Sequence, residues 1–164
     1  GVKLLKRSNL IDPNRVAIMG ASFGGFLSIA GAAFEPDMYR CAITVVGVFD
    51  WKHVIGQRSS NRYDRFNYDI LKERLGSEED QKAAFNRISP LSHTANIRIP
   101  VYISAGESDR TVDAHQSKKL AKELKSQGNR VKTFFPDTEG HSYFKTKNRI
   151  RLYTEIDAFL KKHL

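Results

Sequence analysis

Four short apolar runs, separated by longer segments with helical spacing, dominate the hydrophobic pattern of the chain. The runs are RVAIM (Arg15–Met19), CAITVVGV (Cys41–Val48), VYISAG (Val101–Gly106) and VKTFF (Val131–Phe135). We interpret each run as continuous rather than alternating, which is typical of strands that are covered on both faces. The pattern therefore predicts four strands of a mostly parallel sheet.

Helical patterns follow three of these runs. They cover residues 22–34, 112–127 and 146–163, and a strand followed by a helix is the repeating unit of a parallel sheet with crossover helices. In the last helix, the apolar residues at helical spacing are Ile150, Tyr153, Ile156, Phe159 and Leu160. The predicted fold class is α/β, a three-layer α/β/α sandwich around a mostly parallel sheet.

Two further segments are the start of the chain and the stretch between the second and third strands. Residues 1–15 have the pattern of a helix end, closed by Asn9 and the turn DPN. We expect a further element before this starting segment, because a parallel strand such as Arg15–Met19 normally has neighbours on both sides. The polar stretch 49–96 contains RSSNRYDRFNY (58–68), and we interpret it as a flap or cap over the sheet.

The composition indicates a soluble globular protein. The 164 residues are 40% hydrophobic and 27% charged, and we expect residues 1–164 to form a single domain that is a fragment of a longer protein. No run approaches the ~20 apolar residues that a membrane span needs, so we expect no membrane partner. Cys41 is the only cysteine, which excludes an internal disulfide. The compartment, cytoplasm or periplasm, stays open.

The chain is basic, with 27 lysine and arginine residues against 18 aspartate and glutamate residues. A net charge of +9 raises the possibility of a nucleic-acid partner. A solvated helix face accounts for several of the lysines, because they lie opposite Leu120, Ala121 and Leu124: Lys118, Lys119, Lys122 and Lys125. The chain also has no zinc-finger spacing, phosphate loop or aromatic RNA-binding motif, so we expect no nucleic-acid partner.

The segment GASFGG, which begins at Gly20, lies between the first predicted strand and the first predicted helix. A G-x-S-x-G pattern in this context is typical of a nucleophile elbow, in which a strained turn raises the Ser22 Oγ above the end of the sheet. We expect small residues at Gly20 and Gly24 to let the helix approach the strand, with Gly25 adding room. The backbone N–H of Phe23 would face a developing oxyanion. The alternative is that Ser22 only caps the helix.

A nucleophilic serine needs a base and an acid, and in folds with such an elbow they follow in the order serine, acid, histidine. Asp109 comes just after the third predicted strand, and His141 lies in the loop before the last helix. Both positions belong to the carboxyl edge of the sheet, where sites of open α/β folds collect. His141 would take the proton from Ser22, and Asp109 would hold the tautomer of the imidazole.

Other acids and histidines are weaker candidates. Glu107 is too close to the strand end, Asp113 begins a helix, and Asp137 lies beside the candidate histidine. The remaining histidines show no metal-ligand spacing: His53, His93, His115 and His163. We expect no metal and no cofactor, because the reaction of a serine, histidine and aspartate triad needs none.

These segments together resemble the catalytic domain of the prolyl oligopeptidase family of serine peptidases, especially its acylaminoacyl-peptidase-like and dipeptidyl-aminopeptidase-like members. The resemblance rests on DPNRVAIMGASFGGF, FEPDMYRCAITVVGVFDW, ISP, IPVYISAGESDRTVDAHQSKKLAKELKSQG and FFPDTEGHSYF, in this order. It implies the C-terminal portion of an α/β-hydrolase fold without its N-terminal strands. It also implies a peptidase that hydrolyses short peptides through an acyl-enzyme.

The resemblance assigns roles to individual residues. Ser22 corresponds to the nucleophile, Asp109 to the acid, His141 to the base, and the backbone of Phe23 to one oxyanion donor. Trp51 follows the strand that leads into the specificity pocket in the family, which makes it a candidate pocket wall. The alternative for Trp51 is an ordinary core aromatic residue.

The chain departs from the family pattern in two respects. It lacks the N-terminal β-propeller and the first half of the hydrolase sheet, including the second oxyanion donor, and it has Ser142 and Tyr143 where close relatives have a tryptophan after the histidine. Two alternative functions therefore stand beside the peptidase. One is a carboxylesterase with the same triad. The other is an inert fragment that acts as an interaction unit, for example a homo-oligomer paired through the exposed edge strand Arg15–Met19.

Overall fold

The computed structural model describes residues 1–54, 69–70, 73 and 78–164. At its centre lies a parallel sheet of four strands in the order β1-β2-β3-β4. The strands are β1 (Ala17–Ala21), β2 (Cys41–Val45), β3 (Val101–Ser104) and β4 (Val131–Phe134). In the register of the sheet, Ala17 pairs with Cys41, Ala42 with Val101, and Val101 with Val131. Each predicted run contributes one strand, which confirms the predicted parallel sheet.

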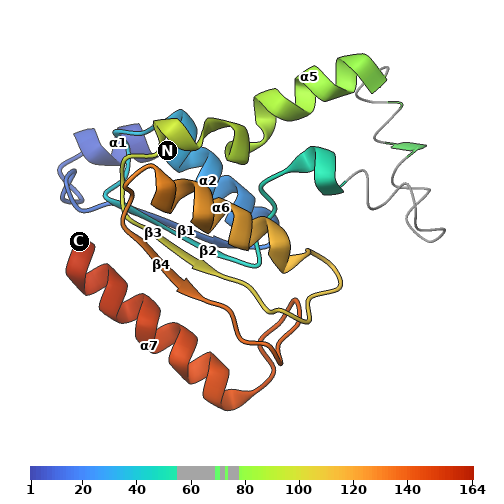
Figure 1. The fold of residues 1–164 in the computed structure, drawn as a ribbon. Helices are drawn as coiled ribbons and strands as arrows, with labels where there is room; N and C mark the ends of the chain where they lie inside the picture. The colour runs from blue at the N-terminus through green and yellow to red at the C-terminus, as the bar shows by residue number, and fades with distance from the viewer. Residues whose placement is uncertain (55–68, 71–72, 74–77) are drawn as a thin grey trace.

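Helices cover both faces of this sheet and form the outer layers (Figure 1). α2 (Phe23–Phe34) and α6 (Ala114–Ser126) lie on one face, and α7 (Thr146–His163) lies on the other. The predicted three-layer α/β/α sandwich is confirmed. The bounds of α7 agree with the predicted residues 146–163, whereas α2 and α6 begin one and two residues later than predicted because Ser22 and Asp113 stand at their N-caps.

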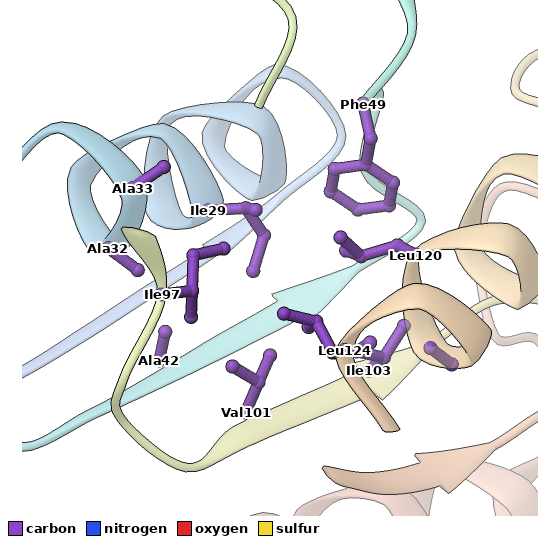
Figure 2. Close-up of a cluster of buried hydrophobic side chains, with 11 residues drawn as sticks. Ile29, Ala32, Ala33, Ala42, Phe49, Ile97, Val101, Ile103, Leu120 and Leu124 are labelled. Carbon is purple, nitrogen blue, oxygen red and sulfur yellow. The ribbon is translucent and has the colours of Figure 1, made fainter. Parts of the chain in front are cut away.

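Most of the buried apolar side chains form two clusters, one on each face of the sheet. The cluster beneath α2 and α6, drawn in Figure 2, consists of Ile29, Ala32, Ala33, Ala42, Phe49, Ile97, Val101, Ile103, Leu120, Ala121 and Leu124. The cluster beneath α7 consists of Cys41, Ile43, Val45, Val46, Tyr102, Phe134, Tyr143, Leu152, Ile156 and Phe159. Successive residues of β2, such as Ala42 and Ile43, belong to different clusters, because side chains alternate between the two faces of a strand.

The central strands explain the continuous apolar runs of the sequence. All residues of β2 and β3 are buried, whereas β1 and β4, at the edges, are only partly buried. Several predicted bounds are wrong. β1 begins and ends two residues later than predicted, β3 ends at Ser104 rather than Gly106, and β4 ends at Phe134 rather than Phe135. The largest difference is at β2, which ends at Val45 rather than Val48. The physical reason is that Val46 has a φ of 48°, which is incompatible with an extended strand.

The face that α7 presents to the sheet contains only part of the apolar residues that lie at helical spacing in the sequence. Its buried residues are Leu152, Ile156 and Phe159, whereas Ile150 and Tyr153 are 62% and 63% exposed. A helix turns by about 100° per residue, so Ile150 lies about 200° around the helix from Leu152 and cannot share its face. Of the five apolar residues at helical spacing in this helix, Ile150 and Tyr153 therefore lie outside the buried face.

The start of the chain agrees with its prediction. α1 (Val2–Arg7) ends shortly before Asn9, which has a φ of 58°, and the N–H of Asn14 donates to Oδ1 of Asp12 at 2.9 Å in the following turn. Within the stretch 49–96, the structure describes α5 (Glu78–Ile88) and the 3-10 helix η1 (Pro90–Asn96), which packs against α2 and α6. The segment 58–68, on which the interpretation as a flap rests, lies outside the described residues.

The lysines of α6 lie on the exposed face, as predicted, and the residues opposite them are buried. The exposed set is Lys118, Lys119, Lys122 and Lys125, and the buried set is Leu120, Ala121 and Leu124. A solvated helix face therefore accounts for this part of the positive charge. Within the ranges that the structure describes, no helix is long and apolar enough to cross a membrane.

Candidate active site

The candidate residues lie at the carboxyl ends of three strands. Ser22 follows β1 directly, Asp109 lies in the loop after β3, and His141 lies in the loop between β4 and α7. Parallel strands present all of these loops at the same edge of the sheet, and this edge is where open α/β folds bind ligands. The topology therefore brings together residues that are far apart in the sequence.

Ser22 occupies the sharp turn between β1 and α2, with a φ of 54° and a ψ of −120°. A positive φ is uncommon for a residue that has a Cβ atom, and it is strained. The N–H of Ser22 donates to the carbonyl of Val45 at 2.9 Å, which ties the turn to β2. Although Ser22 stands at the N-cap of α2, its side chain makes no capping hydrogen bond. The structure therefore does not support the capping alternative.

Two glycines allow α2 to approach the sheet closely. A Cβ atom added at Gly20 would collide with the backbone of Gly24, and one at Gly25 would lie 2.6 Å from Oγ1 of Thr44 and 2.9 Å from Cα of Gly47. A Cβ atom added at Gly24 would meet nothing within 4 Å. The expectation that Gly24 makes room is wrong, because its carbonyl faces Gly20 while its side-chain position faces open space.

Gly20→Ala is expected to lower the free energy of unfolding by about 3 kcal/mol, because the new methyl group meets rigid backbone atoms of Gly24. Urea denaturation measures the effect. Gly24→Ala is the matched control, and we expect it to be neutral or to stabilise the helix by about 0.5–1 kcal/mol. Equal destabilisation by the two substitutions would contradict this account of the elbow.

Two hydrogen bonds connect the three candidate residues. Nε2 of His141 lies 2.9 Å from Oγ of Ser22, and Nδ1 of His141 lies 2.8 Å from Oδ2 of Asp109. An ionised carboxylate only accepts hydrogen bonds, so Nδ1 of the neutral imidazole carries the proton and Nε2 can accept one from the hydroxyl of Ser22. In this arrangement a histidine can act as a base toward a serine.

The carboxylate of Asp109 is held on both of its oxygens. Its side chain has no exposed area, and Oδ1 accepts hydrogen bonds from the N–H groups of Thr111 at 2.8 Å and Val112 at 3.0 Å. Burying a carboxylate costs free energy unless it is hydrogen-bonded, and the two backbone N–H groups provide these hydrogen bonds from the same loop. Oδ2 is thereby directed at His141, whose side chain is 29% exposed and accessible from outside.

The loops that carry Asp109 and His141 are in direct backbone contact. The N–H of Ser108 donates to the carbonyl of Glu139 at 2.9 Å. A Cβ atom added at Gly106 would collide with the same carbonyl, so only a glycine fits at this position. The relative position of the acid and the base is therefore built into the contact between these two loops.

Two buried residues beside His141 are not singled out by the sequence analysis as functional. Glu139 is 1% exposed, and an acid two positions before the candidate histidine is the only sequence signal for it. Tyr143 is 8% exposed, and its hydroxyl lies 2.7 Å from Oγ of Ser104, which in turn donates to the carbonyl of Phe134 at 2.8 Å. Burial raises the pKa of Tyr143 to about 12, although the hydrogen bond with Ser104 lowers it.

Phe23 and Trp51 form an aromatic surface beside Ser22. The ring of Phe23, which is 56% exposed, lies 5.3 Å from the ring of Phe26 and 6.3 Å from that of Trp51. The rings of Phe26 and Trp51 are 5.4 Å apart and pack against a small buried cluster: Val48, Val54 and Val112. The position of Trp51 is compatible with a pocket wall as well as with a core role.

The other acids and histidines take structural positions. Glu107 pairs with Lys118 at 2.8 Å, and Asp113 accepts a hydrogen bond from the N–H of His115 at the start of α6, as predicted. Asp137 is exposed. Among the described residues, no group of three or more histidine, cysteine, aspartate or glutamate side chains could hold a metal ion.

Comparisons with known proteins agree on one family. The profile described as "Prolyl oligopeptidase family" matches residues 1–164. Dipeptidyl aminopeptidase BIII of Pseudoxanthomonas mexicana is 27% identical over 161 residues, which are 96% of this chain and 23% of that protein. The chain thus spans about a quarter of the length of such curated relatives.

Solved structures show the same fold. A puromycin-hydrolyzing peptidase of Mycobacterium tuberculosis superposes with a TM-score of 0.84 at 25% identity, covering 99% of this chain and 24% of that one. The uncomplexed acylaminoacyl peptidase of Pyrococcus horikoshii superposes with a TM-score of 0.82 at 20% identity, covering 99% of this chain and 26% of that one. The α/β-hydrolase assignment made from the sequence is confirmed by these structures.

Proposed function

The chain belongs to the prolyl oligopeptidase family, and we propose that it hydrolyses short peptides as a serine peptidase with Ser22 as its nucleophile. The observation that carries the proposal is the hydrogen-bonded chain from Oγ of Ser22 through His141 to the buried carboxylate of Asp109. The strained backbone of Ser22 supports it, because such strain is characteristic of functional turns.

In the proposed reaction, Oγ of Ser22 attacks the carbonyl carbon of the scissile peptide bond while Nε2 of His141 takes its proton. Asp109 keeps Nδ1 protonated and stabilises the imidazolium that forms. The N–H of Phe23, at the N-terminus of α2, donates to the oxyanion. His141 then protonates the leaving amine, and water hydrolyses the acyl-enzyme on Ser22 with the same histidine as base.

The proposed substrate carries an apolar side chain at the residue whose carbonyl is attacked. Phe23, Phe26 and Trp51 place aromatic rings beside the nucleophile, and Phe23 remains more than half exposed there. An apolar substrate side chain would remove part of this aromatic surface from water, which favours binding.

Trp51→Ala is expected to lower kcat/KM by about 10- to 100-fold for a peptide with a large apolar residue at that position. The physical reason is the loss of one wall of the aromatic surface. Steady-state kinetics with paired substrates, one with phenylalanine and one with alanine at that position, measure the effect. Phe34→Ala, which removes a 47% exposed ring at the other end of α2, is the control. Equal losses for both substrates would favour the core role of Trp51.

Labelling with a fluorophosphonate probe, followed by intact mass and peptide mapping, tests the proposed nucleophile. We expect one adduct, located on Ser22. Absence of an adduct would count against catalysis by this chain. Hydrolysis of peptide anilides compared with p-nitrophenyl esters then separates the peptidase from the carboxylesterase, because activity on esters alone would overturn the peptidase proposal.

An inert interaction unit remains the second candidate because of the β1 edge. In the part of the chain that the structure describes, β1 pairs with β2 on one side only, and Met19 of β1 and Leu27 of α2 are each 50% exposed. An unpaired strand edge is a template for pairing with another chain. Size-exclusion chromatography addresses this candidate, since a clean monomer would count against a homo-oligomer paired through β1.

A further inference from the structure

Glu139 is a buried carboxylate whose hydrogen-bond donors come from the first turn of α7 and the two residues before it. The residue is 1% exposed. Oε2 accepts the N–H of Phe144 at 2.8 Å, and Oε1 accepts the N–H of Lys145 at 3.1 Å and Nδ2 of Asn148 at 2.8 Å. A buried carboxylate with this many donors is strongly held in place, and the dipole at the N-terminus of a helix adds to the attraction.

The charge of Glu139 is favoured by these contacts. Burial by itself raises the pKa of the carboxyl group, but the hydrogen bonds from Asn148, Phe144 and Lys145, together with the charge of Lys145, outweigh it and lower the pKa below its ordinary value. Glu139 is therefore an anion at neutral pH, and its three donors bind a charged acceptor.

These contacts close a small loop around His141. The carboxylate of Glu139 binds the N–H of Phe144, so His141 lies between two residues that are tied together. The carbonyl of Glu139 accepts the N–H of Ser108, which precedes Asp109. One residue thus links three parts of the site: the loop of the candidate base, the loop of the candidate acid and the start of α7.

We propose that Glu139 is a positioning residue for the reaction, and that its carboxylate holds the imidazole of His141 between Ser22 and Asp109. This inference rests on the proposed function, because it assigns Glu139 a part in that reaction. Glu139 acts through the backbone of its loop and does not touch the substrate. Small displacements of a catalytic group reduce rates steeply, so holding this loop in place has a direct effect on catalysis.

A purely structural role for the same carboxylate makes a different prediction. Lys145, the N-cap residue of α7, makes no side-chain capping hydrogen bond, so Glu139 also supplies acceptors to the start of that helix. If this were its whole role, removing its charge would lower the melting temperature and leave the imidazole of the folded protein in place. The discriminating measurement must therefore report on His141 in folded protein.

The test compares Glu139→Gln with Asp137→Asn in the full 164-residue chain. Glu139→Gln keeps the size of the side chain but removes the charge and turns an NH2 group toward N–H donors. Asp137→Asn makes the same change of charge on an exposed side chain in the same loop. The first readout is the rate of fluorophosphonate labelling, measured well below the melting temperature. The second is the low-field proton signal of Nδ1 of His141, which reports its hydrogen bond with Asp109.

We expect Glu139→Gln to slow labelling by about 10- to 100-fold and to shift or broaden the signal of His141, with Asp137→Asn leaving both unchanged. A lower melting temperature with unchanged labelling and an unchanged signal would overturn the proposal. If the wild-type chain is not labelled at all, the proposed function fails, whereas the signal of His141 still decides whether Glu139 positions the imidazole.

A milder variant serves if Glu139→Gln does not fold. Asn148→Ala removes one of the three donors to Glu139 and leaves the two backbone donors in place. We expect a change in the same direction and of smaller size, a several-fold slower labelling with a shifted signal of His141. An unchanged rate and an unchanged signal in this variant would overturn the proposal.

Discussion

Ser22→Ala is expected to lower the turnover of a peptide substrate by about 10⁶-fold, because the bond-forming oxygen is lost and the two partner residues act only through it. Fluorophosphonate labelling should vanish in the same variant. The fold should persist, since alanine has the same backbone requirements as serine at a φ of 54° and the side chain of Ser22 makes no capping hydrogen bond. Intact mass measures the labelling, circular dichroism measures the fold, and the rate of peptide hydrolysis measures the turnover.

The matched control is Ser142→Ala, which removes an exposed hydroxyl next to His141. We expect this variant to be labelled and to turn over substrate like the wild type. Labelling that persists in Ser22→Ala would show that the probe reacts elsewhere. In that case the elbow is not the nucleophilic site.

His141→Ala is expected to reduce turnover by a comparable factor, about 10⁶-fold, because the hydroxyl of Ser22 loses the group that accepts its proton. The two residues act as a unit, so the double variant Ser22→Ala/His141→Ala should be no slower than either single variant. The measurement is kcat for the wild type, the two single variants and the double variant, a cycle that detects non-additivity directly.

His115→Ala is the control for this prediction, since it removes an exposed imidazole in α6 that is not part of the hydrogen-bonded chain of Ser22, His141 and Asp109. We expect kcat to remain at the wild-type value. A His141→Ala variant within tenfold of the wild type, or single effects that simply add in the double variant, would contradict the assigned base.

Much of the fold could be predicted from the sequence because the determining features are local. The apolar runs at β2 and β3 are continuous since both faces of these strands are covered, and the helix after β4 shows its 3.6-residue period clearly enough to give both of its ends. Asp113 was predictable as a helix start because its carboxylate can cap the first turn.

The differences between sequence and structure concern features that depend on neighbours in space. Gly24 and Gly25 are equivalent in the sequence, but only Gly25 faces the sheet, and this depends on how α2 is seated on β2. Ile150 is as apolar as Ile156, yet it points away from the sheet because α7 has one orientation about its axis. Val46 carries no sequence signal for its positive φ, which ends β2 early.

The candidate site also has some features that could be predicted from the sequence and others that could not. The sequence order of Ser22, Asp109 and His141 was sufficient to predict the three residues and their proposed roles, and those roles stay predictions until the variants are measured. The hydrogen bonds that join them, and the buried contacts of Glu139, could not be predicted from the sequence. Nothing in the chain order states that the carboxylate of Glu139 binds the start of α7.

The sequence by itself therefore determined the fold class, the family and the identity of the candidate residues, since periodicity, turn chemistry and short motifs are encoded in neighbouring positions. Only the tertiary structure decided which glycines admit α2, which face of α7 is buried, and that Ser22 lies 2.9 Å from a histidine 119 positions further along the chain. The physical reason is that such distances depend on how strands align and helices pack, which no single segment specifies.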